Sequence, residues 1–126
     1  MGATKPKILV IDDDQSMLQL LRLQLSNAGY EVLLAEDAVV GGRLALSAAP
    51  DLMIVDVKMP YMDGYEFVAA AKSDSGTRNI PVIFLTSVDD IADRAAELGA
   101  AAYLTKPVLA DRLLEIVALF AAKPGA

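Results

Sequence analysis

The chain of 126 residues has 17 acidic and 11 basic side chains, and its net charge of −6 argues against a direct nucleic-acid partner. It has no cysteine and no histidine, which excludes disulfides, thiolate or imidazole chemistry and the usual zinc ligands, so that any bound metal must be held by oxygen. Hydrophobic residues make up 55% of the chain, but no apolar run reaches the roughly 18 residues of a membrane span and no signal-peptide pattern is present, so we expect a cytoplasmic protein without membrane insertion.

Short apolar runs alternate with segments of helical periodicity along the whole chain. The runs predict five strands, at Lys7–Ile11, Glu31–Ala35, Leu52–Asp56, Pro81–Thr86 and Ala101–Thr105. Helices are predicted between and after them, at about Met17–Ala28, Asp37–Ala49, Tyr65–Lys72, Asp90–Leu98 and Leu109–Ala122. Gly41-Gly42 makes the bounds of the second helix the least defined, and the last helix carries Leu113, Ile116, Val117 and Phe120 on one face.

This alternation predicts an α/β fold, a doubly wound, five-stranded parallel sheet with helices on both faces. We expect one domain over residues 1–126, with a core at about 7–122 and a short tail at 123–126.

Polar residues follow four of the predicted strands at their carboxyl ends. They are Asp12 and Asp13 after the first strand, Asp56 at the end of the third, Thr86 at the end of the fourth and Lys106 after the fifth. The carboxyl ends of parallel strands lie on one edge of a sheet, so these side chains are expected to converge there.

Three carboxylates in one pocket would repel one another unless a cation offset their charge. Oxygen ligands favour Mg²⁺, with Mn²⁺ as a substitute, and such sites act with phosphate. Lys106 would balance charge on a phosphoryl oxygen and Thr86 would hydrogen-bond another. Without histidine or cysteine, Asp56 is the credible nucleophile for a covalent phosphoryl intermediate.

In their order and positions these residues resemble the receiver domain of two-component response regulators, including single-domain, chemotaxis-regulator-like members. The resemblance rests on Asp12-Asp13, on Asp56 with Met59-Pro60 and Asp63-Gly64, on Thr86-Ser87 and on Lys106-Pro107, and it covers about Lys7 to Ala122. It implies a flavodoxin-like (βα)5 fold with strand order 2-1-3-4-5 and a cis Lys106-Pro107 bond.

The resemblance implies that Asp56 accepts a phosphoryl group from a sensor histidine kinase or a histidine phosphotransfer protein. Such a protein is a signalling phosphoacceptor, which catalyses only its own phosphorylation and slow dephosphorylation. Asp13 and Asp56 would ligate Mg²⁺ directly and Asp12 through water, and the backbone carbonyl of Lys58 would be a further ligand.

Switching would couple Thr86 to Tyr103 and signal to a downstream protein effector through the surface formed by the predicted segments 90–98, 101–105 and 109–122. Ala102 stands where one DNA-binding subfamily usually carries Asp, so that subfamily's dimer is not implied, and a monomer and a weak dimer both stay open.

Two alternatives come from other functional classes. Asp12-Asp-Asp14-Gln-Ser16 can also be interpreted as the nucleophile motif of a haloacid-dehalogenase-type phosphohydrolase, with Asp12 attacking and Asp14 as the acid. The chain is short for that core, and the hydrolase would leave Asp56 unexplained. The other alternative is a receiver-like interaction module that does not turn over phosphate.

Overall fold

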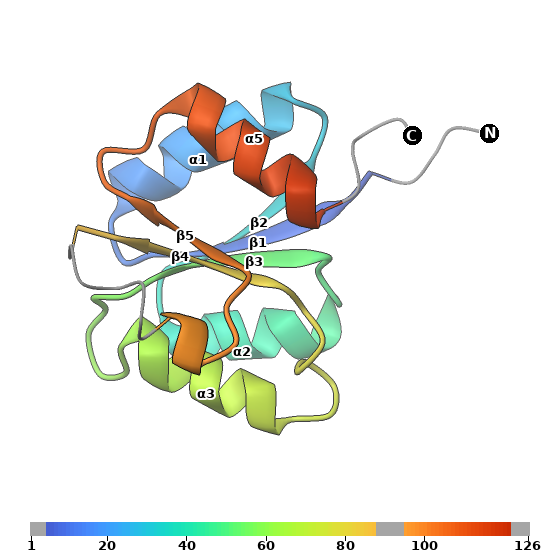
Figure 1. Cartoon of the computed structure of the whole chain (residues 1–126), viewed down its shortest axis with the longest axis vertical. Coiled ribbons are helices and arrows are strands. Elements are labelled where there is room, and N and C mark those ends of the chain that lie inside the picture. Colours follow the sequence, from blue (N-terminus) through green and yellow to red (C-terminus); the bar gives the residue numbers. More distant parts are fainter. Residues whose placement is uncertain (1–4, 88–94, 122–126) are drawn as a thin grey trace.

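The computed structural model describes residues 5–87 and 95–121, which form a central sheet between two helical layers (Figure 1). The strands are β1 (Lys7–Ile11), β2 (Glu31–Ala35), β3 (Leu52–Asp56), β4 (Val82–Thr86) and β5 (Ala102–Thr105). All pairs are parallel and the strand order is β2-β1-β3-β4-β5, which confirms the predicted fold class and order. Within the described residues, no helix is long and apolar enough to cross a membrane.

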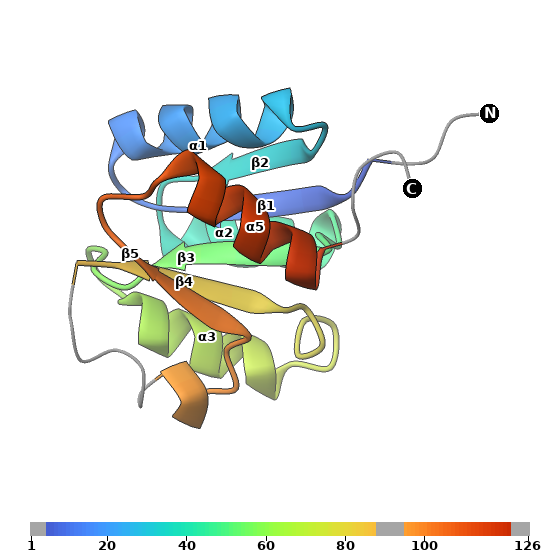
Figure 2. The same cartoon turned by 45° about the horizontal axis from the view of Figure 1, so that its top comes forward.

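The helices are α1 (Gln15–Asn27), α2 (Ala38–Ser47), α3 (Gly64–Ser73) and α5 (Ala110–Phe120). Figure 1 shows α1 and α5 on one face of the sheet and α2 and α3 on the other, and Figure 2 shows the same layers after rotation. The predicted helix at 90–98 lies partly outside the described residues, and residues 95–97 are helical.

Alternate residues of each central strand supply the two halves of the core. Ile8, Val10 and Ile54 face α1 and α5, whereas Leu9, Ile11 and Val55 face α2 and α3. Every residue of β3 and β4 is buried. The continuous apolar runs in the sequence follow from this burial on both faces.

An aspartate caps each of the first three helices where the chain enters it from the strand edge. Asp14 accepts hydrogen bonds from the backbone N–H groups of Ser16 and Met17, and Asp37 and Asp63 cap α2 and α3 in the same manner. The caps of α1 and α2 fix these helix starts close to the ends of β1 and β2, whereas the loop at 57–63 separates β3 from α3.

The contact between α2 and β1 explains the Gly41-Gly42 pair, which the sequence left without a role. A Cβ atom at Gly41 would lie 2.7 Å from Cδ1 of Ile11, whereas one at Gly42 would meet only Phe67, at 3.9 Å. Gly41 therefore permits the close approach of α2 to the sheet, and its cost in helix propensity is offset by that packing.

Several helices and strands begin or end one or two residues away from the predicted bounds. β4 begins at Val82, one residue later than predicted, because Pro81 has no N–H for the ladder and contributes only its carbonyl, to Met53 N at 2.9 Å. The last helix ends at Phe120 and not at Ala122, so Phe120 is 36% exposed at its end, while Ala121 is buried.

Candidate functional site

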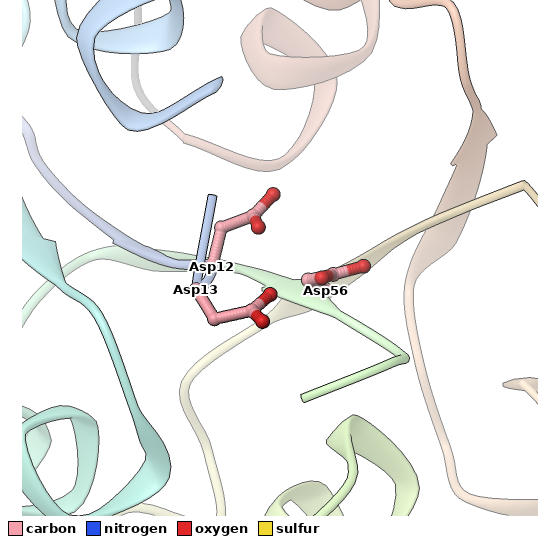
Figure 3. A group of neighbouring side chains, drawn as sticks. All are labelled: Asp12, Asp13 and Asp56. Atoms are coloured by element: carbon pink, nitrogen blue, oxygen red, sulfur yellow. The ribbon is translucent and has the colours of Figure 1, made fainter. Parts of the chain in front are cut away.

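Three carboxylates meet where β1 and β3 end. Atoms of Asp12, Asp13 and Asp56 lie within 4.8 Å of one another, and Figure 3 shows the three side chains pointing into the same space beyond these strands. Asp12 and Asp56 are buried, whereas Asp13 is exposed. The predicted convergence of these residues is therefore present in the folded chain.

The strand ladder places the other two predicted residues beside the carboxylates. Asp56 pairs with Leu85, so Thr86 comes one residue further along the adjacent strand. The backbone N–H of Lys106 donates to the carbonyl of Thr86 at 2.7 Å, which fixes Lys106 just past the end of β5. Thr86 is buried, and the bond between Lys106 and Pro107 is cis, as the resemblance implied.

Lys106 bridges the two buried acids. Its Nζ lies 3.5 Å from Oδ2 of Asp12 and 3.4 Å from Oδ1 of Asp56, and a quarter of its side chain is exposed. Three carboxylates and one ammonium group leave a net formal charge of −2 when all are ionised. The site is therefore short of positive charge.

This charge imbalance appears in the acidity of the groups. Burial, and then the negative charge of Asp12, raise the pKa of Asp56 from 3.8 to about 7, although Lys106 acts in the opposite direction. Burial lowers the pKa of Lys106, but Asp12 and Asp56 together outweigh burial and raise it. Lys106 thus stays charged, while Asp56 is only partly ionised near neutral pH.

The donor set fits a hard divalent cation. Oδ2 of Asp12 is buried and makes no hydrogen bond among the described residues beyond its long ion pair with Lys106 Nζ at 3.5 Å, while Oδ1 accepts from the backbone N–H of Asp14 at 2.9 Å. A buried carboxylate oxygen whose one partner is this distant is under-satisfied, and a divalent cation would complete its coordination. Carboxylate oxygens together with room for water are the ligands that Mg²⁺ prefers.

The remaining predicted residues lie at the margins of the site. Lys58 is exposed in the loop after β3, and Tyr103 on β5 is 38% exposed, so its side chain faces outward in this structure. Asp14 caps α1 and is exposed, as expected for a residue outside the metal cluster. The ligand role of Lys58 and the switch role of Tyr103 stay predictions.

Gly64 has a role that the sequence interpretation missed. A Cβ atom there would lie 2.3 Å from the carbonyl oxygen of Asp56 and 2.9 Å from Cα of Val57. Gly64 N also donates to the Val57 carbonyl at 2.7 Å. The start of α3 thus packs directly against the backbone of Asp56, and the Asp63-Gly64 pair was a signal of this contact that had been assigned only to a turn.

Comparison with known proteins relates both the sequence and the structure of this chain to response regulators. Residues 8–118 match the family model described as response regulator receiver domain. The chemotaxis protein CheY4 of Vibrio cholerae superposes with a TM-score of 0.88 at 33% identity, covering 93% of this chain and 99% of that one.

Curated relatives include RpaA of Synechocystis, a DNA-binding dual master transcriptional regulator, which is 38% identical over 111 residues, and the response regulator PleD of Caulobacter vibrioides, which is 39% identical over 104 residues. The matches cover 86% and 81% of this chain, but only 46% and 23% of the relatives. The chain therefore spans less than half the length of these two regulators.

Proposed function

This chain belongs to the response regulator receiver domain family, and from that premise we propose that Asp56 accepts a phosphoryl group from a phosphohistidine. The donor is a sensor histidine kinase or a histidine phosphotransfer protein. One observation carries the proposal. Asp56 is a buried carboxylate at the end of β3, it shares Lys106 with the buried Asp12, and the exposed Asp13 lies beside both acids.

In the proposed transfer, a carboxylate oxygen of Asp56 attacks phosphorus and forms a P–O bond while the P–N bond to the donor imidazole breaks. The imidazole keeps the bonding electron pair and takes a proton from solvent. We propose that Lys106, which lies 3.4 Å from Asp56, contacts an incoming phosphoryl oxygen and that the Thr86 hydroxyl hydrogen-bonds another.

Receiver domains bind Mg²⁺ through acidic residues, and the cluster of this chain has the composition of such a site. We propose Asp12, Asp13, Asp56 and the backbone carbonyl of Lys58 as the groups around the ion, with Mn²⁺ able to replace it. Such an ion supplies the positive charge that the site lacks, which keeps Asp56 ionised and offsets charge on the phosphoryl oxygens.

We further infer that the receiver catalyses its own phosphorylation and slow dephosphorylation and acts in the cytoplasm. Output passes to a protein effector through β5, α5 and the helical residues 95–97, with Thr86 and Tyr103 as the switch. The net charge of −6 favours a protein partner for this domain over nucleic acid. The domain is proposed to extend over residues 1–126, as a monomer or a weak dimer.

Mass spectrometry after acetyl phosphate treatment and borohydride trapping tests the proposal. The label is expected on Asp56, with Mg²⁺ required, and Asp56→Asn should abolish it while the helix-cap variant Asp63→Asn retains it. A label on Asp12 would instead support the hydrolase alternative. The absence of any label under conditions that label a known receiver would support the interaction module.

The geometry already favours Asp56 over the hydrolase assignment. That assignment needs Asp14 as an acid, but Oδ1 of Asp14 accepts hydrogen bonds from Ser16 N at 2.9 Å and Met17 N at 3.3 Å, which is the role of a helix cap. Asp14 is also exposed and lies outside the carboxylate cluster of Asp12, Asp13 and Asp56, so its side chain serves the start of α1.

A further inference from the structure

An apolar groove is lined by residues of α2, α3 and the segments that precede these helices. Figures 1 and 2 show α2 and α3 on the face of the sheet opposite α1 and α5. The groove consists of two hollows, of about 490 and 240 Å³, that share Ala38 and Met62 and therefore join. The floor is formed by small residues of the two helices, namely Ala38, Gly42, Ala45, Ala70 and Ala71, with Phe67 between them.

Large apolar side chains stand exposed on the rim of this groove. Val39 is 72% exposed, Leu46 is 58% exposed and Tyr61 is fully exposed. Val39 and Leu46 are seven residues apart on α2, which places them on the same side of the helix two turns apart. These side chains line or border the hollows, so the exposed apolar surface is contiguous and is not a set of scattered residues.

Tyr61 adds a second observation at one end of the groove. Its backbone has φ of 70°, a conformation that non-glycine residues adopt at a cost of order 1 kcal/mol. The strained backbone holds a fully exposed aromatic ring beside Met62. Tyrosine is enriched among the residues that anchor protein interfaces, where its ring is buried on binding.

The two charged residues that line the groove are both acidic. Asp37 lines one hollow and Asp74 the other, and no lysine or arginine is among the residues that the structure places in either lining. A second copy of a chain with a net charge of −6 would bring acids against acids. A partner with positive charge near both ends of its contact would complement the groove.

We propose that the α2–α3 groove docks an amphipathic helix of a partner protein, with apolar residues on one face and lysine or arginine near both ends. A helix suits the surface because α2 and α3 present side chains and no free strand edge, so binding depends on apolar anchors entering hollows. The proposal is independent of phosphotransfer to Asp56, because it concerns the unphosphorylated protein and a different surface.

The test uses a synthetic Leu/Lys amphipathic peptide of about 18 residues, long enough to form a helix, titrated into the isotopically labelled full chain and followed by NMR. Amide shifts should saturate and map to α2, α3 and residues 60–62. A Leu/Glu peptide of the same pattern should not bind.

Two variants probe the groove from different directions. Gly42→Leu fills its floor, where a Cβ has room, and Tyr61→Ser removes the exposed anchor. Each should weaken binding at least about tenfold, as loss of a central anchor does. Leu23→Ser, a similar removal of an exposed apolar side chain from α1, should leave binding unchanged.

Equal binding of both peptides, shifts confined to α1 and α5, or unchanged affinity in both groove variants would overturn the proposal. So would sedimentation showing that the chain self-associates and that Tyr61→Ser makes it monomeric, because the occupant would then be a second copy.

Discussion

Replacing Asp56 by Asn should stabilise the metal-free protein, and the gain should grow as pH rises. In the folded protein, burial and the negative charge of Asp12 raise the pKa of Asp56 from its ordinary 3.8 to about 7. Between these values the folded state binds more protons than the unfolded state, so the free energy of unfolding falls as pH rises from about 4 to 7. Above pH 7 the ionised Asp56 carboxylate destabilises the folded state by its full amount.

The size of this effect follows from the shift. Three pKa units correspond to about 4 kcal/mol, and solvent reaching the site on the partly exposed side of Lys106 reduces this to an expected 1–3 kcal/mol (order of magnitude). Asn removes the charge at nearly constant shape, so Asp56→Asn should be more stable than the wild type by about this amount at pH 8 and by roughly a third of it near pH 5.

Urea denaturation in EDTA, repeated from pH 5 to pH 8, measures this difference. The matched control is Asp37→Asn, which keeps a capping side chain on α2 outside the carboxylate cluster, and its difference from the wild type should stay nearly constant. If Asp56→Asn proves less stable than the wild type at pH 8, or if the difference does not change with pH, the electrostatic account of the site is wrong.

Three further results are expected. Mg²⁺ at about 100 times its dissociation constant should raise the free energy of unfolding by about 2.7 kcal/mol, and thermal melts of Asp13→Asn should show a much smaller rise. Lys106→Met should destabilise the metal-free protein by less than the 3–5 kcal/mol typical of a fully buried pair. Calorimetry should nevertheless find Mg²⁺ binding retained or tightened, because the formal charge of the site changes from −2 to −3. Loss of Mg²⁺ binding would count against Lys106 as the balancing cation. Gly64→Ala should lower the free energy of unfolding by about 3 kcal/mol or more through its clash with the Asp56 backbone, whereas Gly42→Ala should raise it by up to about 1 kcal/mol in the same urea assay. Equal effects of the two substitutions would contradict the packing argument.

The fold could be predicted from the sequence because buried strands and amphipathic helices each show a characteristic pattern of hydrophobic residues. Strands buried on both faces appear as continuous apolar runs, and their alternation with amphipathic helices admits few arrangements. The convergence of Asp12, Asp56 and Lys106 followed from the same topology, since strand ends share an edge. These predictions needed no knowledge of individual contacts.

What the sequence could not supply depends on distances between elements. The bridging position of Lys106 and the raised pKa of Asp56 arise from separations of 3.4 and 3.5 Å, which periodicity does not encode. The close contacts made by Gly41 and Gly64 are tertiary, so the sequence showed only a propensity cost at one and a turn at the other. The exposure of Phe120 depends on where α5 ends, and helix ends are the least predictable feature of such patterns.

Charge balance connects the proposed chemistry to the proposed switch. A divalent cation would bring the formal charge of the site from −2 to about zero. Phosphorylation replaces the single charge of Asp56 by about −1.5 to −2, so the loaded site would again be negative by up to about one unit.

Of the proposed residues, Lys106 already contacts Asp56, and Thr86 lies on the adjacent strand with a hydroxyl that can donate a hydrogen bond. Movement of Thr86 toward the phosphoryl group would let its hydroxyl donate to a phosphoryl oxygen, which stabilises the excess charge without neutralising it. Because Thr86 pairs with Thr105, two residues after Tyr103, the same movement would be transmitted to β5. By linkage, a cation that favours the phosphorylated state must bind that state more tightly by the same factor.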